Sequence, residues 1–173
     1  MKKIITKAAI VAIAVTMCMT AFAQEQGDKA VAANVVFSGS RYGGYTYTHI
    51  GVSAKGRYNI LDAVRAEGEL TFFLPKDYWT SVDLSLNGHY LLPIADMITV
   101  YPLAGIGIYN SFYTGKGIGY SNYNNVCFNL GGGIDFNITD QLYFTVEAKA
   151  KIANRHYYGG LNLLVSAGVA FKF

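Results

Sequence analysis

The sequence predicts an all-β protein: an eight-stranded antiparallel transmembrane β-barrel, preceded by a cleavable signal peptide. Three observations predict this fold. The final stretch, Leu161–Phe173, alternates with a period of two, which puts one set of residues on each face of an extended chain. It is longer than the roughly 9–11 residues that a tilted transmembrane strand needs. Seven earlier stretches repeat the pattern, and none of the eight has a charged residue on its apolar face.

Met1–Ala23 has the features of a secretory signal peptide. Three lysines precede an apolar segment at Ile10–Val15, and Ala21–Ala23 fits the small-residue pattern of a cleavage site. The apolar segment is too short to span a membrane as a retained anchor. We therefore expect a signal peptide at residues 1–23, a mature chain that begins at Gln24, and one barrel domain at residues 24–173.

The charge balance gives no indication of a nucleic-acid partner. Three of the 14 Lys and Arg residues lie in the predicted signal peptide and none of the 11 acids does, so the remaining chain has no net charge. Cleavage also removes Cys18 and leaves Cys127 alone, so no internal disulfide can form. We expect no cofactor and no metal site, because the chain has no phosphate-binding loop and no metal-spaced Cys/His set.

Four alternating stretches occupy the first half of the predicted barrel. A Gly- and Tyr-rich loop is expected at Ser38–Thr48, a tight turn at Leu61–Ala63, and a break at Pro75–Asp77. The four stretches between these connections are Val31–Phe37, Ile50–Ile60, Val64–Leu74 and Thr80–Tyr90.

Four further stretches complete the set, and a turn at Pro93–Met97 precedes them. They are Ile98–Ile108, Val126–Phe136, Leu142–Ile152 and Leu161–Phe173, and they are separated by the longest loop at Asn110–Asn124, a turn at Asn137–Asp140 and a loop at Ala153–Gly159. Pro102 lies in the middle of the first of these and cannot donate a ladder hydrogen bond, so we expect a bulge or a local break there.

Eight is an even number, as single-chain bacterial barrels require, and long and short connections alternate along the chain. Short connections lie on the periplasmic side of such barrels and long ones on the extracellular side. Both termini are therefore expected in the periplasm.

Alternation alone does not say which face is outside, because a soluble lipocalin-like barrel alternates with its apolar side inward. The polar face holds charges of both signs in nearly equal numbers, as a closed interior needs. The cations are Lys55, Arg57, Arg65, Lys149, Lys151 and Lys172, and the acids are Glu67, Glu69, Asp83, Asp135 and Glu147. A charge on the lipid face would cost about 2–4 kcal/mol at the midplane, which explains why the apolar face has none.

Aromatic residues also favour the membrane interpretation. One lies on the apolar face at the short-turn end of each of four strands: Tyr58, Tyr90, Phe136 and Phe173. Such a ring is typical of the aromatic girdle at a lipid interface, which we expect here at the periplasmic side.

With its signal peptide, its eight strands and its ending Val169-Ala170-Phe171-Lys172-Phe173, the chain resembles the small outer-membrane β-barrel family that includes OmpX and the OmpA membrane domain. It is most similar to the "porin family" barrels of Gram-negative bacteria, particularly Bacteroidetes. The resemblance covers Gln24–Phe173 and is specific for architecture, not for activity. It implies location in the outer membrane, and a terminal signal for the barrel-assembly machinery formed by Val169, Phe171 and Phe173.

The function expected from these features is a structural or surface-interaction role without catalysis. An eight-stranded barrel is just wide enough inside for side chains to fill it. The expected partners are outer-membrane lipid, lipopolysaccharide and the assembly machinery, with a possible extracellular ligand bound through the tyrosine-rich loops. We expect a monomer and no nucleic acid.

Three alternatives stay open at this stage. The first is a barrel enzyme that modifies lipid A or phospholipid, with His49 or His156 meeting a loop serine (Ser38, Ser40, Ser111 or Ser121) as base and nucleophile. His89 is instead expected inside, near the periplasmic end. The others are a narrow channel and a soluble ligand-binding barrel.

The most specific expectation concerns the charges inside the barrel. A three-residue turn at Leu61–Ala63 pairs Ile60 with Val64 and then places Arg57 opposite Glu67 and Lys55 opposite Glu69. We expect these four residues to form a lumenal charge ladder that plugs and rigidifies the barrel, to which Asp83, Glu147 and Lys149 also belong.

Overall fold

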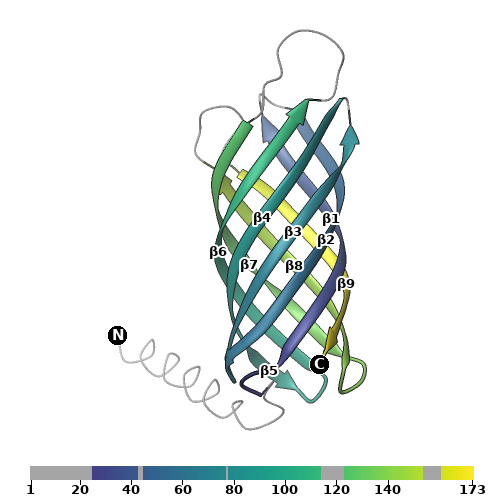
Figure 1. Cartoon of the computed structure of the whole chain (residues 1–173), viewed down its shortest axis with the longest axis vertical. Coiled ribbons are helices and arrows are strands. Elements are labelled where there is room, and N and C mark those ends of the chain that lie inside the picture. The colour runs from purple at the N-terminus through teal and green to yellow at the C-terminus, as the bar shows by residue number, and fades with distance from the viewer. Residues whose placement is uncertain (1–24, 43–44, 77, 114–122, 154–160) are drawn as a thin grey trace, which may run out of the picture.

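The computed structural model describes residues 25–42, 45–76, 78–113, 123–153 and 161–173, which form a closed antiparallel β-barrel (Figure 1). The predicted signal peptide at 1–23 lies outside the described residues. Within the described part, no helix is long and apolar enough to cross a membrane.

The described residues contain eight long strands and one short strand. They are β1 (Lys29–Tyr42), β2 (Tyr45–Leu61), β3 (Val64–Lys76), β4 (Trp79–Tyr90), β5 (Leu92–Ala95), β6 (Ile98–Tyr113), β7 (Tyr123–Asn137), β8 (Leu142–Ala153) and β9 (Leu161–Lys172).

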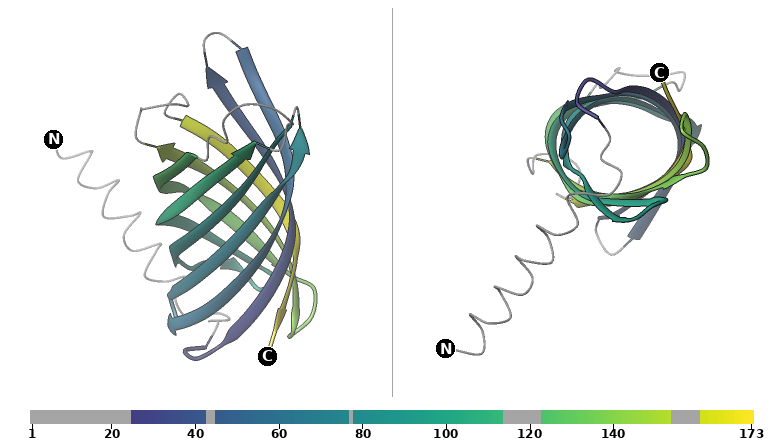
Figure 2. Two further views of the ribbon diagram at one scale, coloured as in Figure 1. Left: turned by 45° about the horizontal axis from the view of Figure 1, so that its top comes forward. Right: turned by 90° about the horizontal axis from the view of Figure 1, so that it is seen from below.

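Each long strand pairs with its neighbours along the chain, and the first and last strands pair with each other. β1 pairs antiparallel with β9 from Ala30↔Lys172 to Ser40↔Asn162, and the β4–β6 pairing joins the other ends of the sheet. Seen along its length, the barrel is a closed ring (Figure 2). The predicted eight-stranded barrel is therefore confirmed, and β5 is a short addition that pairs with β6 below the end of β4.

Side chains alternate between the two sides of the wall as the sequence predicts. In β3 the buried residues Glu67, Glu69 and Thr71 point inward, while Leu70 and Phe72 lie on the exterior with exposed fractions of 51% and 42%. The exterior is apolar and the interior polar, which is the arrangement of a barrel that faces lipid. A soluble barrel with an apolar interior is excluded by this polarity.

Several predicted connections are wrong, because the strands extend further than their apolar alternation shows. β1 runs to Tyr42 and β2 begins at Tyr45, so most of the predicted loop at Ser38–Thr48 is a paired hairpin. Threonine and tyrosine favour extended structure, and cross-strand pairing outweighs the neighbouring glycines.

The longest predicted loop, Asn110–Asn124, is shorter at both ends, because β6 continues to Tyr113 and β7 begins at Tyr123. The turn predicted at Pro93–Met97 is also wrong in part, since β5 occupies much of it and pairs with the start of β6.

The turn between β2 and β3 differs from the prediction in its local register. Leu61, rather than Ile60, pairs with Val64, and the register shifts between Asn59 and Leu61. This bulge inserts one extra residue into β2. Beyond it the register is the predicted one, so the charged positions keep the expected face.

The prediction at Pro102 is confirmed on one side of β6. Pairing with β7 continues through Pro102↔Gly132 without a shift. On the other side, pairing with β4 ends at His89↔Leu103 and resumes with β5 at Leu92↔Val100, so the ladder has a local break opposite the proline.

Candidate functional site

The interior of the barrel holds a cluster of buried charges that come mainly from β2, β3 and β8. Cross-strand register places Lys55 opposite Glu69 and Arg57 opposite Glu67. All four side chains are almost completely buried. In the described residues, five buried cations match five buried acids: Lys55, Arg57, Arg65, Lys149 and Lys151 against Glu67, Glu69, Asp83, Asp135 and Glu147.

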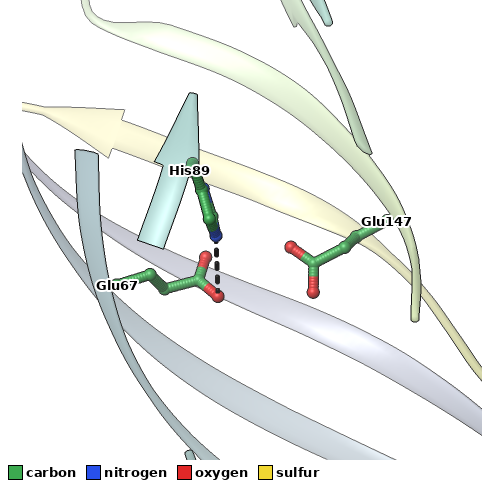
Figure 3. A group of neighbouring side chains, drawn as sticks. All are labelled: Glu67, His89 and Glu147. Atoms are coloured by element: carbon green, nitrogen blue, oxygen red, sulfur yellow. Dashed lines mark ion pairs between the residues drawn. The ribbon is translucent and has the colours of Figure 1, made fainter. Parts of the chain in front are cut away.

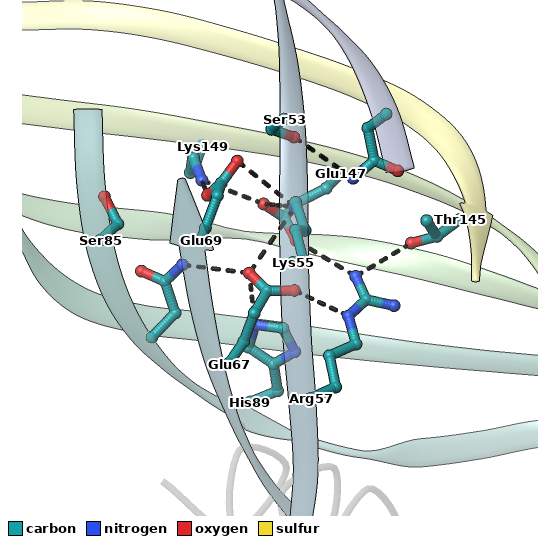
Figure 4. Close-up of polar contacts among 12 residues, drawn as sticks. Ser53, Lys55, Arg57, Glu67, Glu69, Ser85, His89, Thr145, Glu147 and Lys149 are labelled. Atoms are coloured by element: carbon teal, nitrogen blue, oxygen red, sulfur yellow. Dashed lines mark hydrogen bonds and ion pairs between the residues drawn. The ribbon is translucent and has the colours of Figure 1, made fainter. Parts of the chain in front are cut away.

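Lys55 lies at the centre of this cluster (Figure 4). Its Nζ donates to Glu147 Oε1 at 2.8 Å, and it lies 3.6 Å from Glu67 Oε1 and 3.7 Å from Glu69 Oε1. Lys149 donates to Glu69 and lies 3.3 Å from Glu147 Oε1. Two lysines from opposite walls therefore neutralise carboxylates from β3 and β8.

Arg57 connects this centre with the half of the lumen near the start of β1 and the end of β9. Its Nε donates to Glu67 Oε2 at 2.7 Å, and its terminal nitrogens donate to Tyr143, Tyr101 and Thr145 hydroxyls at 3.3–3.4 Å. A guanidinium has five donors and no acceptor, so this oxygen-rich surrounding satisfies it. Asp135 Oδ1 is a further acceptor at 3.5 Å.

Arg65 lies further along, near the turn between β2 and β3. Its Nη1 donates to Asp135 Oδ2 at 2.7 Å, and its guanidinium stacks over the Tyr101 ring at 4.7 Å. Its Nε and Nη2 also face His89 Nδ1 at 3.1 and 3.0 Å. Because arginine can only donate, Nδ1 must accept, so His89 is the neutral imidazole with its hydrogen on Nε2.

Towards the opposite end of the lumen, Lys151 donates to Asp83 and, at 3.0 Å, to Ser85 Oγ. Asn129 donates to Asn87, which in turn donates to Glu67 Oε1 at 3.2 Å. Polar contacts therefore occupy several levels along the middle of the lumen.

Three clusters of buried apolar side chains also lie inside the barrel. Val36, Phe73 and Leu164 form a buried cluster inside the extracellular half, with Tyr109 packed against it. Leu91, Tyr101 and Leu103 form another in the periplasmic half, beside a third cluster of Ala30, Ala32, Tyr143 and Ala170. The charged network therefore lies among buried apolar side chains, and Arg57 and Arg65 also line a small pocket near Asp28 and Lys172.

Three lumenal groups come close enough to suggest a metal site: Glu67, His89 and Glu147 (Figure 3). One ligand atom from each lies within 4.8 Å of the others, and His89 Nε2 is 3.6 Å from Glu67 Oε1 without a hydrogen-bond partner. However, the Lys55 ammonium contacts both carboxylates and supplies the positive charge that a metal ion would bring. The two carboxylates and the histidine therefore fit an ion-pair cluster around the Lys55 ammonium better than a metal centre.

All seven residues of the predicted ladder lie inside the barrel and are buried. Sequence reasoning left Arg65, Asp135 and Lys151 out of the ladder, although it placed them on the inner face. It placed Tyr101 inside as well, which is confirmed, but did not foresee that the Tyr101 hydroxyl contacts Arg57, Thr145 and Glu147. Strand parity identifies such inward residues, but the contacts across the lumen depend on the closure of the barrel.

The candidate catalytic residues are only partly brought together. Ser38 and His49 are cross-strand partners on β1 and β2, whereas Ser111 instead hydrogen-bonds Ser81 at 3.1 Å. Ser121 and His156 lie outside the described residues.

The residues predicted for the girdle and for assembly all lie on the exterior. Tyr58, Tyr90, Phe136 and Phe173 have exposed fractions of 46%, 42%, 36% and 67%. On the last strand, Val169 and Phe171 are also exposed and pair with β1 and β8.

Comparison with known proteins supports the same architecture. A family model described as "Outer membrane protein beta-barrel domain" matches residues 9–173. No curated protein matches the chain.

Solved structures of three bacterial barrels are similar over most of the chain. Neisserial surface protein A (NspA) has a TM-score of 0.72 and 13% identity, covering 86% of this chain and 100% of its own. Ail, the attachment invasion locus protein of Yersinia pestis, has a TM-score of 0.63, 14% identity and coverages of 86% and 99%. The N-terminal barrel domain of Pseudomonas aeruginosa OprF has a TM-score of 0.62, 17% identity and coverages of 87% and 100%. At these identities the likeness concerns the fold.

Proposed function

We propose that this chain, which belongs to the outer membrane protein β-barrel domain family, has a structural or surface-interaction role without catalysis. The protein is located in the bacterial outer membrane. None of the three similar barrels is named for an enzymatic activity.

The observation that carries this proposal is the filled lumen. Five buried cations and five buried acids compensate one another inside, and further buried apolar side chains pack in the lumen beside them. An ion entering this space would have to displace several buried pairs, each of which costs energy to break. The geometry therefore supports a closed barrel rather than a channel.

Planar-bilayer recording of the refolded protein tests the proposal. We expect no steady ion current from the wild-type barrel. The Arg57→Ala/Glu67→Ala double variant keeps the lumen neutral but removes two large side chains, so it serves as the sensitivity control. A steady, concentration-dependent current through the wild type would instead support the narrow channel.

The surface-interaction role is supported by an aromatic cluster at the extracellular end. The rings of Tyr78 and Tyr113 have centroids 6.3 Å apart, and those of Trp79 and Tyr113 are 5.2 Å apart. Tyr78 is 68% exposed and has a φ of 65°, a conformation unusual for a residue other than glycine. Exposed, rigid aromatic side chains supply contact area at low entropic cost.

We also propose export by the signal peptide and assembly through the last strand. Mass spectrometry of the purified protein tests the first, with a mature N-terminus at Gln24 as the expected result. Deletion of Phe173 tests the second and should lower the fraction of protein assembled in the outer membrane.

A second candidate function, a lipid-modifying enzyme, is favoured by one observation, the cross-strand pair Ser38↔His49. Directly opposed residues lie within reach of a hydrogen bond, as nucleophile and base require. Incubation with lipid A and phospholipid discriminates the two functions. Release of fatty acid by the wild type, lost in both Ser38→Ala and His49→Ala, would establish the enzyme; no release supports the non-catalytic role.

A further inference from the structure

His89 is a buried histidine near the end of β4, and its contacts require one protonation state. Its exposed fraction is 2%. Arg65 of β3 is its cross-strand partner and directs both Nε and Nη2 at the Nδ1 atom of the imidazole, at 3.1 and 3.0 Å. Because a guanidinium has no acceptor, Nδ1 must keep its lone pair for these contacts. His89 can therefore hold Arg65 only while the imidazole is neutral.

The ring of Tyr101 on β6 keeps these two groups side by side. The His89 ring stacks on it with the centroids 4.6 Å apart and the planes 9° from parallel. The Arg65 guanidinium carbon lies 4.7 Å from the same Tyr101 centroid. We call these three residues, His89, Arg65 and Tyr101, the His89 latch. Separating the imidazole from the guanidinium costs an aromatic contact as well as the hydrogen bonds.

The acids near the imidazole are already neutralised (Figure 3). Nε2 of His89 is 3.6 Å from Glu67 Oε1, and Glu147 of β8 is the second carboxylate of this group. Lys55 contacts both carboxylates, and Arg57 of β2 donates to Glu67 Oε2 at 2.7 Å. A proton on the imidazole would therefore find no unpaired negative charge to compensate it.

The charge balance of the lumen also depends on a neutral His89. Over the part of the chain that the structure describes, the five buried cations match the five buried acids without it. A proton at Nδ1 adds a sixth buried cation, 3.0 Å from the nearest guanidinium nitrogen of Arg65. An uncompensated buried charge is costly, so the closed latch excludes the proton.

We propose that the His89 latch is an acid-sensitive switch, in which a proton taken up at Nδ1 releases Arg65 and loosens this end of the lumen. Nδ1 gains a hydrogen, and the two Arg65 contacts are lost. Arg65 also lines a small pocket with Asp28 and Lys172, which are partly exposed, so water has a route to the latch. The inference does not depend on whether the lumen conducts ions or on the absence of catalysis.

The proposal fixes the direction of the pH dependence. A histidine in the unfolded chain binds a proton below about pH 6.5, whereas His89 in the closed latch does not. The unfolded state then binds more protons in acid, so stability is complete above about pH 6.5 and falls as the pH drops below it. If the closed latch excludes the proton fully, the equilibrium constant for unfolding rises about thirtyfold between pH 7.5 and pH 5.

Urea unfolding of the barrel in lipid vesicles over this pH range, followed by heat-modifiable gel mobility, tests the switch. His89→Asn offers Arg65 an amide oxygen near the position of Nδ1 but cannot take up a proton. Its smaller side chain lowers stability equally at every pH, so the slope with pH carries the test. The matched control is the double variant His49→Asn/His156→Asn, which leaves His89 as the only histidine of the chain.

We expect the wild type and the double variant to lose stability alike as the pH falls, and His89→Asn to lose most of this dependence. A wild type with no pH dependence between pH 7.5 and pH 5 would overturn the proposal. So would an equal loss in His89→Asn, which would assign the effect to the carboxylates.

A second measurement does not depend on the folding of His89→Asn. In the double variant, ¹⁵N NMR of the labelled histidine reports His89 alone. We expect a neutral imidazole without a hydrogen on Nδ1 in the folded barrel at pH 5.5. A charged imidazole in the folded barrel at that pH would show that the latch tolerates the proton and would refute the switch.

Discussion

Replacing Glu67 with alanine removes a carboxylate from the centre of the lumen, and we expect the free energy of unfolding to fall by about 3 kcal/mol. Removing one partner of a buried ion pair costs about 3–5 kcal/mol, because the other charge is left uncompensated. Arg57 loses its acceptor at 2.7 Å but keeps Asp135 at 3.5 Å and Glu147 at 3.9 Å. These remaining carboxylates place the expected loss at the lower end of that range.

The double variant Glu67→Ala/Arg57→Ala tests the physical reason. Without the arginine no uncompensated charge remains at this level, so part of the lost stability should return and the two substitutions should not be additive. A coupling energy of about 1–3 kcal/mol is typical of residues in one network. Urea unfolding of the barrel in lipid vesicles, followed by heat-modifiable gel mobility, gives the midpoints.

The pair Lys172–Asp28 provides a matched control in the same chain. Its atoms lie 3.2 Å apart, but the two side chains are 36% and 23% exposed. Because solvent screens such a pair, the corresponding cycle of alanine variants should give a coupling below about 1 kcal/mol. Plain additivity at Arg57 and Glu67, equal to that of the control, would refute the idea that the buried pair braces the barrel.

Three further outcomes are expected. Gly133→Ala should lower the urea midpoint, because its Cβ would lie 2.4–2.8 Å from atoms of the Tyr101 ring and hydroxyl, whereas Gly56→Ala, which meets nothing, should not. Leu84→Lys, on the lipid face with an exposed fraction of 55%, should cost about 2–4 kcal/mol if it lies near the midplane, measured by the same unfolding assay with Leu84→Ala as the control. Protease added to intact cells should cut within Asn110–Asn124, and complete protection of this segment would mean that the assigned orientation is wrong.

The sequence was sufficient to predict which face each barrel residue occupies. Side chains on a strand alternate strictly between the two faces, and a single charge on the lipid face is costly. The face of each residue could therefore be predicted from the sequence pattern alone. The same reasoning placed Arg57 opposite Glu67, although it missed the bulge at Ile60. It missed the bulge because the alternation of apolar residues is interrupted only at the turn itself.

Strand ends and contacts across the lumen could not be predicted in this way. The β1–β2 hairpin extends beyond the apolar belt, where polar residues pair through their backbones and leave no hydrophobic alternation to detect. The partner of Lys55 at 2.8 Å is Glu147, 92 residues later, on a strand that is not its neighbour. Such a contact depends on the radius and shear of the closed barrel, which no local pattern encodes.

The arrangement of the lumenal pairs explains why they would stiffen the barrel as well as fill it. Lys149 of β8 bonds Glu69 of β3, Lys151 of β8 bonds Asp83 of β4, and Arg65 of β3 bonds Asp135 of β7. The two strands of each pair are not neighbours in the sheet and share no backbone hydrogen bonds. Each side-chain bond therefore connects two strands across the lumen that are otherwise linked only through the intervening strands. A path for ions would require several of these ion pairs to open together, and opening any one of them leaves two buried charges without a partner. Rigidity and closure of the lumen thus have the same physical origin.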